Sequence, residues 1–289
     1  MQAAWINDAG FAGCFVAIDQ GYYAAEGLEL TCLSGGPDVI PEATIVAGRA
    51  DLALTTPDTT IKPILEQGAK FRIIGTQYQK NPVGIVSLAS NPITSPAEMM
   101  GKTIAVPPVN TISIEAVLAM QGNDRASVNF VPHACDPTPL LRGAIDASLD
   151  FTTNVAFTIR TTGEQAASFL LYDFGYTICN VTIAVTEDVL AAKRGELVAW
   201  LRASRKGWIE NLADPAMWPP KWATTHFAGT GRSIENEVCF NTAQKPLVDS
   251  PAGIFAMTEE GIAGNLEALA KVGINGTRAM FDTTLLDRI

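Results

Sequence analysis

Charged residues and histidines are scarce in this sequence. Asp, Glu, Lys and Arg make up 17% of the 289 residues and only two residues are histidines, whereas hydrophobic residues make up 47%. Because disordered chains combine low hydrophobicity with high net charge, this composition indicates a folded chain with ample material for a core. The length favours two domains, since a single hydrophobic core rarely grows beyond ~250–300 residues.

A basic excess is missing too. The sequence has 20 Lys and Arg residues against 30 Asp and Glu residues, which gives a formal net charge of −10. Nucleic acids and anionic membrane surfaces attract clustered Lys and Arg side chains. The acidic balance therefore argues against both as partners.

Long apolar runs are also absent. No run reaches the ~18 residues that a membrane helix needs. The first ten residues, MQAAWINDAG, lack the positive and then apolar pattern of a signal peptide. We therefore expect a soluble chain, and if the protein is exported, its signal peptide is not part of this sequence.

Motifs for catalysis and metal binding are lacking. Neither His133 nor His226 belongs to an H-E-x-x-H motif, and no G-x-S-x-G, P-loop or G-x-G-x-x-G pattern is present. The cysteines form no C-x-x-C pair, which excludes zinc ribbons and thioredoxin-type sites. We expect most of them to be small core residues, with one disulfide left open; they are Cys14, Cys32, Cys135, Cys179 and Cys239. The sequence therefore predicts no catalytic residue, no metal site and no cofactor.

The sequence does contain an alternation of short apolar stretches and helical patterns. The expected strands are 28–33, 50–54, 71–75, 83–88, 103–106, 128–131, 144–151 and 181–185. The expected helices are 11–25, 39–47, 59–67, 112–121, 137–142, 154–161, 187–213 and 258–272. Strands separated by helices of ~10–15 residues are typical of βαβ units, so we predict an α/β fold with mainly parallel sheets.

A series of short motifs is more specific. WINDAGFAG at 5–13 is followed by GYYAAEGL at 21–28, GGPDV at 35–39, GRAD at 48–51, SPAEMMGKTI at 95–104, DPTPLL at 136–141 and GAIDA at 143–147. In this order and spacing the motifs resemble the NMT1/THI5-like (SsuA/THI5) family of ABC-importer solute-binding proteins, whose members bind thiamine pyrimidines, riboflavin, sulfonates or nitrate. The resemblance covers residues 5 to about 190.

The resemblance implies a two-lobe, periplasmic-binding-protein-like type II fold with a ligand cleft between the lobes. Residues 1–89 plus 181–289 would form lobe one, and residues 90–180 would form lobe two. The resemblance also implies a monomeric, periplasmic or otherwise extracytoplasmic receptor, not an enzyme, that closes on a small-molecule ligand and delivers it to ABC permease subunits.

Loops that follow the expected strands supply the candidate binding residues. In open α/β sheets, ligands bind beyond the carboxyl ends of the strands, where helix N-termini and backbone N–H groups are exposed. We expect loops 7–11, 34–38, 77–81, 107–113 and 151–154 to meet in one cleft, with aromatic residues beside them. The candidates are Trp5, Asn7, Asp8, Phe11, Gly35, Gly36, Asp38, Gln77, Tyr78, Asn110, Thr111, Thr152, Asn154 and Tyr176.

The chemistry of these loops favours a flat heterocycle. Their only basic residue is Lys80, and aromatic faces with a few polar groups suit a ring that stacks while its edge forms hydrogen bonds. We hypothesise a hydroxymethyl- or formylaminomethyl-aminopyrimidine, a thiamine precursor, with Asp8 or Asp38 accepting hydrogen bonds from its amine. A riboflavin-like ring is the nearest alternative. Sulfonate or nitrate is less favoured, although helix N-termini alone can bind anions.

Structural roles stay open for three candidates, and one alternative is an enzyme. Trp5 could simply pack at the first strand, and Asp8 and Asp38 could simply cap the helices that follow them. The family resemblance extends to pyrimidine synthases that use a lysine-bound pyridoxal phosphate and a histidine. Those two positions fall at Thr55 and Thr59 in this sequence, and the cysteine-rich iron motif of the synthases is missing, so the synthase alternative is disfavoured.

Overall fold

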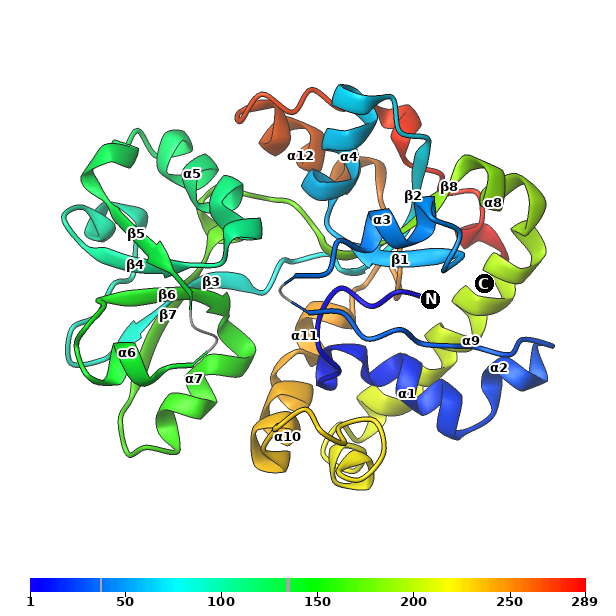
Figure 1. Cartoon of the computed structure of the whole chain (residues 1–289), viewed down its shortest axis with the longest axis horizontal. Coiled ribbons are helices and arrows are strands. Elements are labelled where there is room, and N and C mark those ends of the chain that lie inside the picture. The colour runs from blue at the N-terminus through cyan, green and yellow to red at the C-terminus, as the bar shows by residue number, and fades with distance from the viewer. Residues whose placement is uncertain (37, 134–135) are drawn as a thin grey trace.

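The computed structural model describes residues 1–36, 38–133 and 136–289, and it contains two sheets that are flanked by helices (Figure 1). We call the part built around the three-stranded sheet lobe one and the part built around the five-stranded sheet lobe two. Both lobes combine strands with helices, so the predicted α/β class is confirmed. Both chain termini lie in lobe one.

The lobe-one sheet is formed by three strands, of which the central one is far from the other two in the sequence. Its strand order is β1 (Leu52–Thr55), β8 (Asn180–Thr186) and β2 (Phe71–Tyr78). The central strand β8 pairs antiparallel with both neighbours. Isolated parallel bridges join Gln2 to Ala53 in β1 and to Leu33, so the N-terminal residues extend the sheet beyond its β1 edge.

The lobe-two sheet has the order β5-β4-β6-β3-β7. Its strands are β3 (Val83–Leu88), β4 (Thr103–Val106), β5 (Asn129–Pro132), β6 (Ala147–Phe151) and β7 (Ala166–Leu170). Strand β4 pairs parallel with β5 and β6, whereas β3 pairs antiparallel with β6 and β7.

The expectation of mainly parallel sheets is wrong for the strand ladder of lobe one, and in lobe two it holds only for the pairs that β4 forms. The strand that pairs antiparallel with its neighbours is β8 in the first sheet and β3 in the second. These are the two strands that the chain forms directly after it crosses from one lobe to the other, whereas a strand reached through a helix within one lobe returns in the parallel direction. The local sequence of β3 and β8 gives no sign of the crossing.

The helices cover both sheets. In lobe one they are α1 (Ala12–Asp19), α2 (Tyr22–Ala25), α3 (Pro41–Val46), α4 (Pro57–Gln67), α8 (Glu187–Ala192), α9 (Arg194–Ala213), α10 (Ile234–Ala243), α11 (Lys245–Val248) and α12 (Glu259–Ala270). In lobe two they are α5 (Thr111–Met120), α6 (Thr138–Leu141) and α7 (Thr152–Arg160). Short 3₁₀ turns span Ala9–Phe11, Pro96–Met99, Pro108–Asn110, Arg125–Ser127, Leu171–Phe174, Pro219–Trp222, Arg278–Met280 and Leu286–Arg288.

Several expected elements differ from the structure. The helix expected at 11–25 is split into α1 and α2 by Gly21, whose φ of +69° is the left-handed conformation that ends helices. The strand expected at 28–33 is reduced to the bridge at Leu33. Strand β7 was not expected, because its sequence AASFL is rich in small residues and has no β-branched one.

Helix α10 was also not expected, although it is the lobe-one helix that packs against α7 of lobe two. Its sequence is IENEVCFNTA, and the residues that it buries are Asn236, Glu237, Phe240 and Asn241. Because three of these four are polar, the helix lacks the apolar stripe by which an amphipathic helix is recognised in a sequence.

The C-terminal third contributes to the lobe-one core. Trp200, Trp208, Trp218 and Trp222 are buried, and they belong to the same hydrophobic cluster as Phe15 of α1. Their role is therefore packing, which stabilises the scaffold that holds the N-terminal loop.

The expected absences concern cysteines, metals and membrane spans. Cys14, Cys32, Cys179 and Cys239 are free thiols, and Cys135 lies outside the described residues. Within 1–36, 38–133 and 136–289 no group of three His, Cys, Asp or Glu side chains is placed to hold a metal ion. No helix in the described part of the chain is both long enough and apolar enough to cross a membrane.

Candidate functional site

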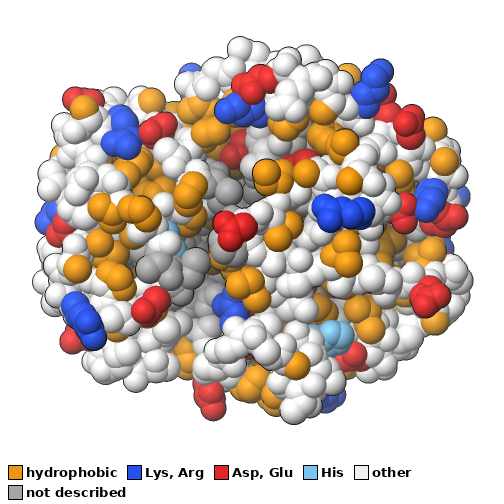
Figure 2. Space-filling view, viewed as in Figure 1, with side chains coloured by type: hydrophobic (Ala, Val, Ile, Leu, Met, Phe, Trp, Pro, Cys, Tyr) orange, Lys and Arg blue, Asp and Glu red, His pale blue; other side chains and the backbone are white. Residues whose placement is uncertain are grey.

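A cavity of about 430 Å³ lies between the two lobes. Lobe one contributes Trp5, Ile6, residues 230–233 and Asn236, and lobe two contributes residues from 132–161 and Ala105. This volume falls within the ~300–1,000 Å³ that is usual for small-molecule sites. Figure 2 shows acidic and basic side chains interspersed over one face of the molecule, with no extended patch of one sign.

Trp5 forms the aromatic part of the lobe-one wall. Its backbone is fixed from two sides, because Gln2 forms parallel bridges to Leu33 and Ala53 and the N–H of Gly35 donates to the Trp5 carbonyl. A Cβ atom at Gly35 would lie 2.6 Å from the Trp5 nitrogen, so only glycine permits this close approach. The Trp5 side chain is half-buried against the lobe-one core and lines the cavity.

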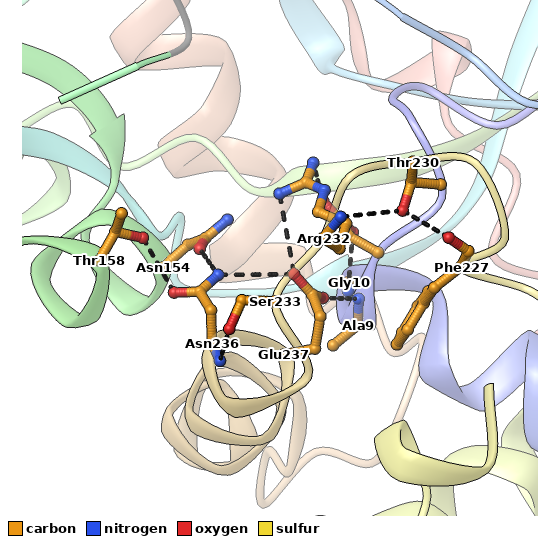
Figure 3. Close-up of polar contacts among 11 residues, drawn as sticks. Ala9, Gly10, Asn154, Thr158, Phe227, Thr230, Arg232, Ser233, Asn236 and Glu237 are labelled. Carbon is orange, nitrogen blue, oxygen red and sulfur yellow. Dashed lines mark hydrogen bonds and ion pairs between the residues drawn. The ribbon is translucent and has the colours of Figure 1, made fainter. Parts of the chain in front are cut away.

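The loop after Trp5 is held by a buried cluster of charges (Figure 3). Asp8 accepts a hydrogen bond from the Gly10 N–H at 2.9 Å, and the Arg232 guanidinium lies 3.2 Å from Asp8 Oδ2. Glu237 accepts from the Ala9 N–H at 2.7 Å, and its Oε1 lies 3.8 Å from Arg232 Nη1. We call Asp8, Arg232 and Glu237 the lobe-one charge cluster.

Burial controls the protonation of this cluster. It raises the pKa of the Asp8 carboxyl to about 7, against the opposing effect of Arg232, and the charge of Glu237 adds to the rise. Burial also raises the pKa of Glu237, opposed by the Ala9 N–H and by Arg232. One guanidinium thus faces two buried carboxyl groups, so its charge is already compensated from within lobe one.

Two helices meet across the cavity, and Asn236 of α10 joins them. Its side-chain amide donates to Asn154 Oδ1 of α7, and its Oδ1 accepts from the Thr158 hydroxyl at 3.0 Å (Figure 3). All three side chains line the cavity. This inter-lobe contact therefore connects the two walls directly beside the space that a ligand would occupy.

The lobe-two wall presents a carboxylate. Asp150, near the end of β6, accepts hydrogen bonds at Oδ2 from the Ser148 hydroxyl and, at 3.0 Å, from His133 Nε2. Its Oδ1 accepts none from the described residues. Serine and histidine both contact the same carboxylate oxygen here, whereas a catalytic triad places the histidine between the serine and the acid. The arrangement suits a carboxylate that is fixed through one oxygen and offers the other to a ligand.

The structure brings only part of the expected set to this cavity. Of the fourteen candidates, Trp5 and Asn154 line it. Asp8 lies behind Arg232 in the charge cluster, and Asn7 donates to the His226 carbonyl at 3.2 Å. Asp38 is exposed and does not line the cavity.

Three candidates support the Asp8 loop from behind. Phe11 is buried 6.4 Å from the Phe15 ring, Gln77 donates to the Gly10 carbonyl at 2.7 Å, and the buried Tyr78 hydroxyl donates to Gln244. Gln244 in turn donates to the Ala9 carbonyl at 2.7 Å. These contacts orient the loop and keep all three side chains away from the cavity.

The remaining candidates lie outside the cavity lining. Gly35 and Gly36 pass close to residues 3–6. Thr152 donates to the Pro82 carbonyl at 3.3 Å, Tyr176 is fully buried, and Asn110 and Thr111 are half-buried at the start of α5.

The residues that sequence reasoning missed are on both walls. Arg232 and Asn236 belong to the segment with the polar-faced helix α10, which offers no recognisable pattern. Asp150 falls within an expected strand, one residue before the loop expected to bind. His133 lies directly after β5, two residues past the end of the strand expected at 128–131, and the loop there was not among those expected to bind. Asp150 was thus missed by one residue, whereas His133 would have been found only by including the loop after that strand.

Comparison with known proteins gives the family. Residues 8–217 match the NMT1/THI5 like family model. The riboflavin-binding protein RibY of Chloroflexus aurantiacus is 28% identical over 217 residues, 73% of this chain and 62% of RibY. The formylaminopyrimidine-binding protein of Halalkalibacterium halodurans is 24% identical over 223 residues, 74% of this chain and 66% of that protein. The chain thus spans less than two thirds of either relative.

Solved structures share the fold over nearly the whole chain. The periplasmic aliphatic sulphonate binding protein SsuA from Escherichia coli has a TM-score of 0.69 at 13% identity, covering 100% of this chain and 96% of SsuA. The desulfurization enzyme DSZB has a TM-score of 0.65 at 13% identity, covering 99% and 97%. The two-lobe periplasmic-binding-protein-like fold is confirmed, and the family match over most of its length shows that the chain belongs to the NMT1/THI5-like family.

Proposed function

We propose that this protein is the solute-binding receptor of an ABC importer and that its ligand is a small heterocycle held in the cavity between the lobes. The observation that carries the proposal is the composition of the two walls, with the Trp5 ring on one and the Asp150 carboxylate and Asn154 amide on the other. A flat ring can stack on the tryptophan while its edge bonds to the polar groups. The two curated relatives, named as binding proteins for riboflavin and for formylaminopyrimidine, support this class of ligand.

The charges on the walls disfavour an inorganic anion or a sulfonate. The lining contains the carboxylates Asp136 and Asp150, and its only Lys or Arg among the described residues is Arg232. Arg232 is already compensated by Asp8 and Glu237. An anionic ligand would therefore meet two further carboxylates and no uncompensated Lys or Arg among the described residues, whereas a ring with N–H donors would find acceptors.

We assign the edge acceptor to Asp150. This role was expected for Asp8 or Asp38, but the first is turned into the charge cluster and the second is exposed away from the cavity. Asp150 lines the cavity with Oδ1 free of hydrogen bonds from the described residues, so it can accept from an exocyclic amine or a protonated ring nitrogen. An aminopyrimidine satisfies this geometry with its amine edge.

A riboflavin-like ligand is the second candidate, and one observation favours it. Hydroxyl side chains of Thr158, Thr161, Thr230 and Ser233 also line the cavity. Each of these hydroxyls donates its hydrogen within the chain, so towards a ligand their oxygens are acceptors, which suits the hydroxyl groups of a polyol chain attached to a ring.

Ligand capture would proceed by hinge closure. The chain crosses between the sheets at residues 79–82 and 171–179, and a ligand that contacts both walls favours the closed arrangement. We propose the lobes at about the expected boundaries, although β3 pairs in the lobe-two sheet and favours placing residues 83–89 there. An extracytoplasmic location, a monomeric state and a permease partner belong to this same proposal.

We also propose that the protein is not an enzyme. The positions where the synthases of this family carry lysine and histidine are Thr55 and Thr59 here, so neither offers an amine or an imidazole. Their hydroxyls are engaged within the chain, because Thr55 bonds to Thr60 and Thr182 and Thr59 donates to Glu42. DSZB shares the fold at an identity too low to carry an activity across.

A calorimetric titration with a ligand panel tests the proposal. The panel contains hydroxymethyl- and formylaminomethyl-aminopyrimidine, riboflavin, an alkanesulfonate and nitrate, each with wild type and with Asp150→Asn. We expect binding of an aminopyrimidine or riboflavin, with affinity at least tenfold lower in the variant because a charge-assisted bond contributes about 1.5–3 kcal/mol. Binding of sulfonate or nitrate alone, or equal affinity in the variant, would refute the assignment.

A further inference from the structure

A second cavity, of about 350 Å³, lies where the two connections leave lobe one. Its wall includes Gln79 from the first connection, Tyr172, Thr177 and Cys179 from the second, and the start of α12 from Thr258. We call it the hinge cavity. Among the described residues, it shares no lining residue with the cavity between the lobes.

The amide groups of the hinge cavity are already engaged within the protein. Asn265 accepts from the Cys179 N–H at 2.9 Å and donates to the Gly261 carbonyl at 2.7 Å. Gln79 donates to the Gly253 carbonyl at 2.9 Å and accepts from the Ser250 hydroxyl. Both amides are thus held in one orientation, and turning either of them toward an occupant would break bonds that hold the connections in place.

The wall of the hinge cavity also carries a negative charge, that of the Glu260 carboxylate. It is the only charged side chain on the lining among the described residues, it is exposed, and it forms no hydrogen bond or ion pair with the described part of the chain. The apolar part of the wall includes Met257, Ile262 and Phe281, together with the Tyr172 ring. A cation with an apolar body matches this combination.

A nearby lysine does not oppose such a ligand. Lys80 lies over the Tyr172 ring, 5.5 Å from its centroid, and its ammonium group pairs with Asp173 at 2.6 Å. Its charge is thus compensated locally, and the carboxylate of Glu260 has no such partner among the described residues.

We propose that the hinge cavity is a second binding site, that it takes a small organic monocation such as a primary amine on a compact apolar body, and that its occupancy changes affinity in the cavity between the lobes. The last part rests on the proposed function. The hinge cavity is bounded by both connections, so its shape depends on the angle between the lobes. An occupant that fits one angle better shifts the population toward it, and the effect on the two ligands is reciprocal.

Ligand-observed NMR with phenethylamine tests the site. The amine is titrated to about 10 mM, because a compact ligand of this size binds in the millimolar range. It is compared with its uncharged analogue 2-phenylethanol, on wild type, on Glu260→Gln and on Glu267→Gln. Glu267 is an exposed residue of the same helix outside the cavity, so its variant controls for net charge. Trp5→Ala is included to separate this site from the other cavity.

The expected result is saturable binding of the amine to wild type, to Glu267→Gln and to Trp5→Ala. The amine should bind Glu260→Gln at least about fivefold more weakly than it binds wild type. The uncharged 2-phenylethanol should bind wild type about as weakly as the amine binds Glu260→Gln. Equal binding to Glu260→Gln, or no saturable binding at all, overturns the site.

The coupling is measured separately. Saturating phenethylamine should change the affinity for the cleft ligand by about threefold or more in wild type but not in Glu260→Gln. If the amine binds and the cleft affinity is unchanged, the regulatory part is overturned while the site stands. If no cleft ligand is found, the proposed function fails and the amine titration still decides the second site.

Discussion

The two helices that face each other across the cavity are held very differently. Helix α10 buries four residues, and its Glu237 bonds to the loop that follows Trp5. Helix α7 buries only Ile159, and its other residues are half-buried or exposed. One wall is thus part of a core and the other lies on a surface. The difference shows that the lobe-one wall is fixed more firmly to its own lobe than the lobe-two wall is to its own.

The same contrast separates the charged groups. In lobe one, Asp8 and Glu237 are directed inward onto Arg232, where they fix the loop. In lobe two, Asp150 is fixed through one oxygen by Ser148 and His133 and lines the cavity. The buried carboxyl groups thus hold a loop on one side, and on the other side a half-buried carboxylate lines the cavity, where we propose that it binds the ligand.

The largest expected effect comes from removing Glu237. Glu237→Ala leaves the Ala9 N–H without its acceptor and removes one of the two carboxyl groups facing Arg232, so unfolding free energy should fall by about 3 kcal/mol. Urea denaturation measures the change. Glu235→Ala, an exposed acid on the same helix, is the control and should cost far less. Equal losses in the two variants would show that the charge cluster does not hold the loop.

The next effect is a pH dependence of stability that arises from Asp8. Its pKa is about 7 in the folded protein and 3.8 in its ordinary state. Between these values the folded chain keeps a proton that the unfolded chain releases, so stability should fall as pH rises from about 4 to about 7, by about 3 kcal/mol.

Asp8→Asn provides the comparison for this pH dependence. The variant should lose most of the slope between pH ~4 and ~7 and retain a smaller one from Glu237, whose pKa is also raised by burial. Denaturation curves over this range measure it. A wild-type curve that rises or stays flat over the window contradicts the assignment.

Trp5→Ala should affect ligand binding more than folding. The side chain is half-buried, so its loss should cost about 1 kcal/mol of stability. Loss of the stacking surface should weaken ligand binding by about 2–3 kcal/mol. Calorimetry and thermal melting together separate the two effects, and Trp5→Phe should recover part of the affinity. A large fall in Tm with unchanged affinity would make Trp5 a packing residue only.

Asn236→Ala should have the smallest effect, and it tests the contact between the walls. Loss of the bonds to Asn154 and Thr158 removes support for the closed arrangement, so ligand affinity should fall by about 1 kcal/mol, roughly fivefold. Solution scattering of the unliganded variant should show a larger radius of gyration. Asn275→Ala, a change at an exposed amide in lobe one, is the control. Identical scattering for the two variants would exclude a role of Asn236 in closure.

Much of the scaffold was predictable because it depends on local patterns. The strands at 71–75, 83–88 and 103–106 were recognisable as runs of apolar and β-branched residues, and each is a strand in the structure. Helix α10 was not recognisable, because its buried face is polar. The direction of β3 and β8 was also hidden, because it depends on where the chain crosses and not on the residues of the strands.

The candidate site shows the same division. Trp5 and Asn154 were expected at the ligand and do line the cavity. Asp8 was expected beside them as an acceptor, and its partner Arg232 lies more than two hundred positions further along the chain, so no local pattern could show that the two would pair.

By itself the sequence determined the α/β class, the family and the absence of recognisable catalytic and metal-binding motifs, because these depend on composition and on short motifs in order. Only the tertiary structure decided which polar side chains face the cavity. Whether a carboxylate binds a ligand or supports a loop depends on which groups lie next to it in the folded chain. In this chain the partners of Asp8 and Asn154 come from a distant segment, at and just before helix α10. Burial then sets the protonation of Asp8, and burial is a property of the packed molecule.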